Sequence, residues 1–221
     1  MQQQHQQNRA NMAETLDVLV AEDGTGAHPY VLSGKLLADR NATRNLADAV
    51  HFLCVLHGRQ PGVLDYAATK VPEKDASEWL IQAANAFSRE RAYLSKLAVA
   101  VGPLPSTVGQ ASCEAALAAQ RHAIDMLAQS DRRGCALGAA IALCLDWLTI
   151  RAILNSAAER LDVKIPDCTL PDVRDTAGLA NGAAASVAVE RAINFGAQQI
   201  LGQHRALWDL LSAREESRRD I

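Results

Sequence analysis

The chain has 221 residues, of which 49% are apolar and 21% charged, and this length suits one domain or at most two small ones. Its net charge of −3 provides no basic field for nucleic acid or anionic lipid, so neither is an expected partner. Alanine (41 residues) and leucine (27) are abundant while aromatic residues make up only 4%, and this composition predicts an all-α fold.

Both ends of the chain are polar. Residues 1–10 are rich in glutamine and lack the apolar core of a signal peptide, so we expect a disordered tail there. Residues 11–214 are predicted to form a single helical-bundle domain, and residues 215–221 a charged C-terminal tail.

The five cysteines indicate a reducing compartment. Their number is odd, no two are spaced as Cys-x-x-Cys, and most lie in apolar helical stretches. This pattern is typical of a cytoplasmic protein and not of a disulfide framework or a zinc site.

Apolar periodicity and capping residues divide the chain into helices. The sequence predicts helices over 11–22, 42–57, 61–70, 74–101, 107–129, 132–161 and 183–214. Asn41 is a candidate N-cap, and Thr107 with Gln110 forms a candidate capping box. Residues 163–181, rich in helix breakers, are predicted to be a loop with at most one helical turn. Four of these helices are long, which predicts an antiparallel bundle with shorter helices packed outside it.

The helix predicted over 132–161 is apolar on every face between Cys135 and Ile153, so we expect it at the centre of the bundle. Its longest apolar run, Cys135–Leu145, is too short to cross a membrane, which takes about 20 residues. Gly134 and Gly138 would let a neighbouring backbone approach closely.

Several polar residues fall inside apolar stripes when each helix is turned by about 100° per residue. These candidate pocket residues, each on a different helix, are Glu90, Gln120, Asp146, His204 and His57. Arg151 is a further candidate on the Asp146 helix, but it points about 140° away and cannot be the intrahelical partner of that carboxylate.

Two interpretations of these interior groups stay open, because an unpaired buried charge is costly. The first is a set of structural salt bridges that fix helix register, with Asp146 paired to Arg91, Arg121 or another helix's base. The second is a polar pocket in the bundle that binds a metal or a small ligand.

Known catalytic and cofactor motifs are missing from the sequence. Di-iron bundles need Glu-x-x-His twice, and no glutamate here is followed by histidine at that spacing; the nearest pairs are Asp48–His51 and His122–Asp125. A P-loop, Gly-x-Gly-x-x-Gly and Gly-x-Ser-x-Gly are also absent. We therefore predict no cofactor and no defined metal ligand, and the motifs leave open whether the protein is an enzyme.

Three stretches carry a resemblance to a known family: Gln120-Arg121-His122, residues 130–140 and Asp146-Trp147. They resemble a bacterial family of helical proteins of unknown function, which implies a helical fold and no particular activity. The layout is also similar to ferritin-like and haem-oxygenase-like bundles, but without their ligand motifs.

The sequence favours a non-catalytic binding or interaction module. Alanine-rich helical faces and low net charge favour self-association, so a homodimer is the expected assembly. The alternative is a metal- or small-ligand-binding bundle, an enzyme or a sensor that uses the interior carboxylates and histidines.

Overall fold

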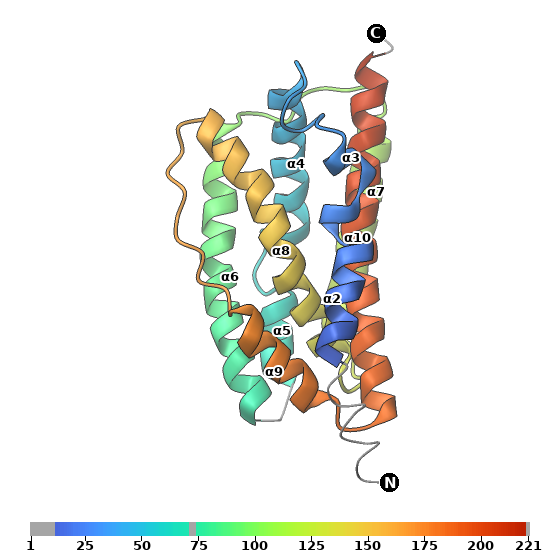
Figure 1. The fold of residues 1–221 in the computed structure, drawn as a ribbon. Coiled ribbons are helices and arrows are strands. Elements are labelled where there is room, and N and C mark those ends of the chain that lie inside the picture. Colours follow the sequence, from blue (N-terminus) through green and yellow to red (C-terminus); the bar gives the residue numbers. More distant parts are fainter. Residues whose placement is uncertain (1–11, 71–73, 220–221) are drawn as a thin grey trace.

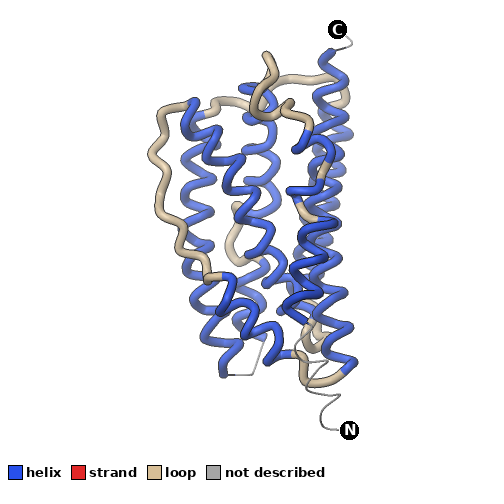
Figure 2. The backbone as a smooth tube through the Cα atoms, viewed as in Figure 1, coloured by secondary structure: helices blue, strands red, loops and turns tan. Residues whose placement is uncertain are grey.

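The computed structural model describes residues 12–70 and 74–219, and every regular element in these ranges is a helix (Figures 1 and 2). The elements in chain order are α2 (Met12–Asp23), the 3₁₀ turn η1 (Thr25–Ala27), α3 (Pro29–Leu32), α4 (Ala42–His57), α5 (Val63–Lys70), α6 (Lys74–Ala100), α7 (Gln110–Ala128), α8 (Cys135–Arg160), α9 (Val173–Ala183) and α10 (Val187–Arg219). The all-α bundle predicted from composition is confirmed. The tail expected over residues 1–10 lies outside the described residues.

The long helices lie side by side along one axis, and α8 runs among α4, α6, α7 and α10 (Figure 1). By length and composition alone α8 could cross a membrane, but 78% of its most apolar stretch is buried inside the protein. This is the environment of a core helix, as its uniformly apolar surface predicts. Helices α8 and α10 run in the same direction, because the segment between them returns along the outside of the bundle and includes α9.

Two glycines bring the backbones of α8 and α10 into contact. A Cβ atom on Gly138 would lie 2.0 Å from the carbonyl oxygen of Ile193, and one on Gly196 would lie 2.0 Å from that of Cys135. Real Cβ atoms never come so close to another backbone, so only glycine fits at either position. The close approach predicted at Gly138 is confirmed.

Two local predictions are wrong, one at the start of a helix and one in a segment predicted to be a loop. Helix α7 begins at Gln110, and Gly109, with a positive φ of 78°, occupies the N-cap position without a side-chain cap, so the expected capping box of Thr107 and Gln110 does not form. Helix α9 (Val173–Ala183) occupies the second half of the loop predicted over 163–181 and extends two residues past it, and the Asp172 side chain caps it by accepting a hydrogen bond from the backbone N–H of Asp175, at 2.8 Å.

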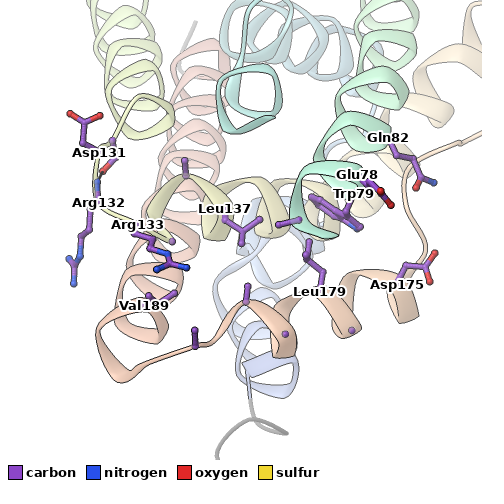
Figure 3. Close-up of a pocket in the computed structure, with 18 of the residues that line it drawn as sticks. Glu78, Trp79, Gln82, Asp131, Arg132, Arg133, Leu137, Asp175, Leu179 and Val189 are labelled. Carbon is purple, nitrogen blue, oxygen red and sulfur yellow. Dashed lines mark hydrogen bonds between the residues drawn. The ribbon is translucent and has the colours of Figure 1, made fainter. Parts of the chain in front are cut away.

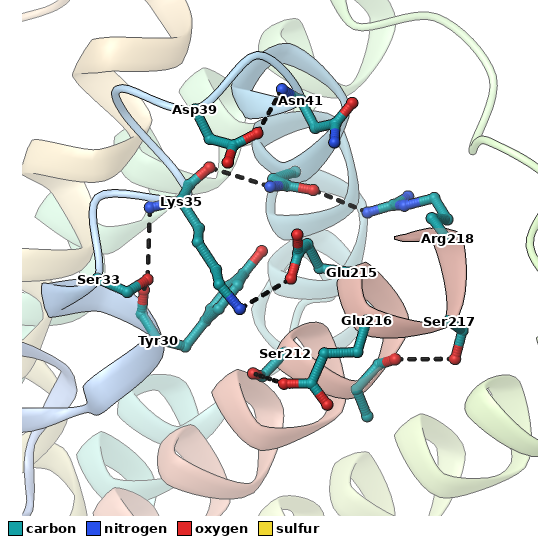
Figure 4. Close-up of polar contacts among 12 residues, drawn as sticks. Tyr30, Ser33, Lys35, Asp39, Asn41, Ser212, Glu215, Glu216, Ser217 and Arg218 are labelled. Atoms are coloured by element: carbon teal, nitrogen blue, oxygen red, sulfur yellow. Dashed lines mark hydrogen bonds and ion pairs between the residues drawn. The ribbon is translucent and has the colours of Figure 1, made fainter. Parts of the chain in front are cut away.

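Helix α10 continues beyond the predicted end at residue 214, because charged side chains of its last turns are paired within the bundle (Figure 4). Arg214 and Glu215 are almost fully buried. The Arg214 Nε atom lies 3.0 Å from Oδ1 of Asp48 on α4, and the Lys35 Nζ atom lies 2.9 Å from Oε2 of Glu215. These pairs hold the end of α10 against α4 and against the segment between α3 and α4.

Candidate functional site

A chain of three buried ionisable side chains crosses the bundle. His204 Nδ1 on α10 lies 2.6 Å from Oδ2 of Asp146 on α8, and His204 Nε2 lies 3.0 Å from Nε2 of His57 on α4. All three residues are at most 5% exposed. The structure therefore brings together three of the residues that sequence periodicity placed in the interior, and the base predicted to meet Asp146 from another helix is His204.

Hydrogen bonding fixes how protons are placed along this chain. Burial alone would raise the pKa of the Asp146 carboxyl, but hydrogen bonds from His204 and Thr25 together hold that pKa below its ordinary value. The ionised carboxylate only accepts, so His204 Nδ1–H is the donor to it. The two Nε2 atoms must then share one hydrogen, because one has to donate and the other accept.

Thr25, in η1, is a partner that the sequence analysis missed. Its backbone N–H and its hydroxyl both donate to Asp146 at 2.7 Å, and the Trp208 indole N–H donates to the same hydroxyl oxygen at 3.0 Å. A Cβ on Gly24 would lie 2.7 Å from the Asp146 carboxylate, which accounts for glycine beside this contact. Thr25 lies in a short turn without helical periodicity, so no pattern marked it.

Glu90 and Arg151 form a second buried group. An Arg151 Nη1–H donates to the Glu90 carboxylate, Arg151 Nη2–H donates to the carbonyl oxygen of Pro166, and the Trp147 indole N–H donates to Glu90 Oε2 at 3.0 Å. The Trp147 ring packs edge-on against His57, with ring centroids 5.5 Å apart. The Trp147 ring therefore lies between Glu90 and the group of Asp146, His204 and His57, and Glu90 does not bind to that group directly.

Arg91 and Arg121, suggested from the sequence as partners of Asp146, do not reach it. Arg91 Nη2–H donates instead to Asp65 on α5 at 2.5 Å, and its Nε–H donates to the carbonyl oxygen of His57 at 3.3 Å. Both arginines line a void of about 20 Å³ beside His57. A void of this size admits roughly one water molecule.

Gln120 does not join either cluster. It is half-buried on α7, and its Oε1 atom has no hydrogen-bond partner among the described residues. Within the same ranges, no group of three or more His, Cys, Asp or Glu side chains is arranged to hold a metal ion.

Burial makes His57 a source of pH-dependent stability. Its pKa is lowered well below 6.5, by burial first and then by the nearby His204 and Arg91. The unfolded chain therefore binds one proton more than the folded chain once the pH falls below about 6.5. We expect the free energy of unfolding to fall between pH 7 and pH 5, with His57 contributing up to about 1.4 kcal/mol per pH unit.

Denaturant melts recorded at several pH values give the free energy of unfolding as a function of pH. Between pH 7 and pH 5 this free energy should fall less steeply in the variant His57→Gln than in the wild type. The variant His122→Gln, at an exposed position on α7, is the control and should keep the wild-type slope. Equal slopes in all three proteins would show that His57 is not held neutral by the fold.

A cleft of about 1010 Å³ lies between the first turns of α6 and α8, the start of α10 and helix α9 (Figure 3). Its apolar wall includes Trp79, Leu137, Leu179 and Val189, and its charged side chains are Glu78, Asp131, Arg132, Arg133, Arg174 and Asp175. Trp79 is 6% exposed, and its indole N–H has no hydrogen-bond acceptor among the described residues. The sequence analysis missed this cleft because one of its walls, α9, was expected to be a loop.

The two sites differ in what they can do chemically. The buried Asp146 chain can hold and transfer a proton, but only the void of about 20 Å³ opens beside it. The cleft has the volume of a typical small-molecule site and combines apolar walls with a few polar groups. Of the two, the cleft is the place where a ligand fits.

The chain has no match among curated proteins and none among solved structures. A family model does match it, over residues 20–219, and this span includes all of the interior polar residues and the cleft. The resemblance to a helical family of unknown function is thus confirmed, and the chain belongs to DUF6975, a family of unknown function.

Proposed function

We propose that this protein is a non-catalytic binding module that holds a small, largely apolar molecule in the cleft between α6, α8, α9 and α10. The observation that carries the proposal is the cleft itself, with its volume of about 1010 Å³ and the buried N–H of Trp79, which has no acceptor among the described residues. A buried donor without a partner costs free energy, and a ligand that accepts its hydrogen bond would remove that cost.

In this proposal the interior charged residues have a structural role. Asp146 is hydrogen-bonded to His204 and Thr25, and Glu90 to Arg151 and Trp147. Each of these contacts joins different elements of the bundle, so together they fix the register of the helices that form the cleft. An enzyme or sensor built on the interior groups is less well supported, because the void beside them admits only about one water molecule.

We further propose that the protein acts in the cytoplasm as a homodimer. The five cysteines are free, which suits a reducing compartment. Alanine-rich helices and a small net charge favour self-association. Sedimentation velocity should give twice the chain mass at micromolar concentration, and a single monomeric species would contradict the dimer.

Nile red, a neutral dye that fluoresces in apolar surroundings, tests binding in the cleft. We expect saturable binding of one dye per chain. Gly178 and Gly182 line the cleft on α9 and have open space where a side chain would begin, so leucine at either position should occupy part of the cleft and lower the affinity at least about tenfold. The measurement is a fluorescence titration of each variant.

The variant Gly202→Leu provides the matched control. Gly202 also faces open space and lies in a helix, α10, but it does not line the cleft. It should bind the dye as the wild type does. If the dye does not bind, or binds equally well after Gly178→Leu and Gly182→Leu, the cleft is not a ligand site.

A further inference from the structure

We infer that the void beside His57 is a binding site for one monatomic anion such as chloride, held by Arg91 and Arg121. The void lies between the end of α4, the start of α5 and the helices α6, α7 and α8. None of the residues that line it lines the cleft, so the inference concerns a second site and does not depend on the ligand proposed for the cleft.

Arg91 on α6 is held in a fixed position beside the void. It is 6% exposed, its Nη2–H donates to Asp65 at 2.5 Å, and its Nε–H donates to the carbonyl oxygen of His57 at 3.3 Å. A Cβ on Gly62 would lie 2.9 Å from Nη2, so the backbone packs closely against the guanidinium group. Because that group is planar, these contacts also fix the direction of Nη1, which is buried without an acceptor among the described residues.

Arg121 on α7 provides a second, independent donor. It lines the same void, and its Nε–H is buried without an acceptor among residues 12–70 and 74–219. A charged donor that is buried without a partner costs free energy. One acceptor in the void would serve both Arg91 and Arg121 and would remove this cost from each.

The charge around the void favours an anion as that acceptor. The residues that line it include three cations and one anion: Arg59, Arg91, Arg121 and Asp125. Asp65, which is paired with Arg91, adds a second negative charge. Three positive and two negative charges leave an excess of one positive charge, which a monovalent anion balances and a water molecule does not.

The size of the void selects a monatomic anion. Its volume is about 20 Å³, which is room for one particle of the size of water. Chloride is of this size, whereas a carboxylate or a phosphate contains several heavy atoms and does not fit. Leu56, Phe87 and Leu143 form apolar parts of the wall, and apolar surroundings strengthen the attraction between an anion and the two arginines.

Thermal melts of the full chain at constant ionic strength test the inference, with sodium chloride replacing sodium gluconate, whose anion is too large for the void. We expect the melting temperature to rise saturably, by about 3 °C at about 100 mM chloride, because chloride binds the folded chain alone. The NMR signal of chloride should broaden when the protein is added, and it should narrow again when bromide competes for the site.

Two variants locate the anion, and a third is the control. Arg121→Gln should lose both chloride effects, while Arg44→Gln, at an exposed position on α4 that does not line the void, should keep them. Asp125→Asn removes a negative charge from the wall, so half of the temperature rise should need roughly threefold less chloride. Melts in gluconate establish that each variant is folded.

The inference is wrong if chloride neither raises the melting temperature above that in gluconate nor broadens the NMR signal. Chloride effects of wild-type size in Arg121→Gln would mean that the ion binds elsewhere, and this result also overturns the inference. Neither result bears on the cleft, which the Nile red titration tests separately.

Discussion

Replacing Asp146 with alanine is expected to lower the free energy of unfolding by about 3–5 kcal/mol. The substitution leaves His204, the Thr25 hydroxyl and the Thr25 backbone N–H without the acceptor they share, in a site with almost no exposure to water. The loss is a large part of a typical stability of about 5–15 kcal/mol. Urea melts followed by circular dichroism measure it, provided that the m-value is unchanged.

Two further variants distinguish the lost interactions from the effect of substitution alone. Asp146→Asn keeps an acceptor oxygen for Thr25 and loses the charge that holds His204, so its loss should be smaller than that of alanine. Asp17→Ala, at an exposed position on α2, should change stability by less than about 0.5 kcal/mol. A change that small in Asp146→Ala would mean that the Asp146 contacts do not hold the bundle together.

Gly138→Ala is expected to destabilise the protein by about 3 kcal/mol, the upper part of the range for overpacking. Its new Cβ would lie 2.0 Å from the backbone carbonyl oxygen of Ile193, so α8 and α10 would have to move apart. Gly196→Ala should behave alike, because its Cβ would meet the carbonyl oxygen of Cys135 at 2.0 Å. Denaturant melts of both variants provide the measurement.

Gly202→Ala is the matched control for this pair, because it lies on α10 with no atom within 4 Å of its new Cβ. Alanine is the better helix former, so this variant should be as stable as the wild type or more stable by up to about 1 kcal/mol. If Gly138→Ala and Gly196→Ala were tolerated equally well, the backbones of α8 and α10 would not be in contact in solution.

The interior polar residues show how much of the site could be predicted from the sequence. Helical periodicity identified Asp146, His204 and His57 as interior, because the side a residue faces depends only on its place in its own helix. It also showed that Arg151 could not reach Asp146, and in the structure Arg151 binds Glu90. Periodicity alone could not choose His204 over Arg91 or Arg121 as the partner of Asp146.

The sequence by itself determined that this protein is all-α, that its apolar central helix lies within residues 132–161, and that Gly138 admits a neighbouring backbone. Each of these follows from local composition and spacing. Only the tertiary structure decided that Thr25 donates hydrogen bonds to Asp146 and that a cleft opens between α6, α8, α9 and α10. Both depend on the relative placement of elements more than a hundred residues apart in the chain, and that placement is set by the packing of the whole bundle and not by any one helix.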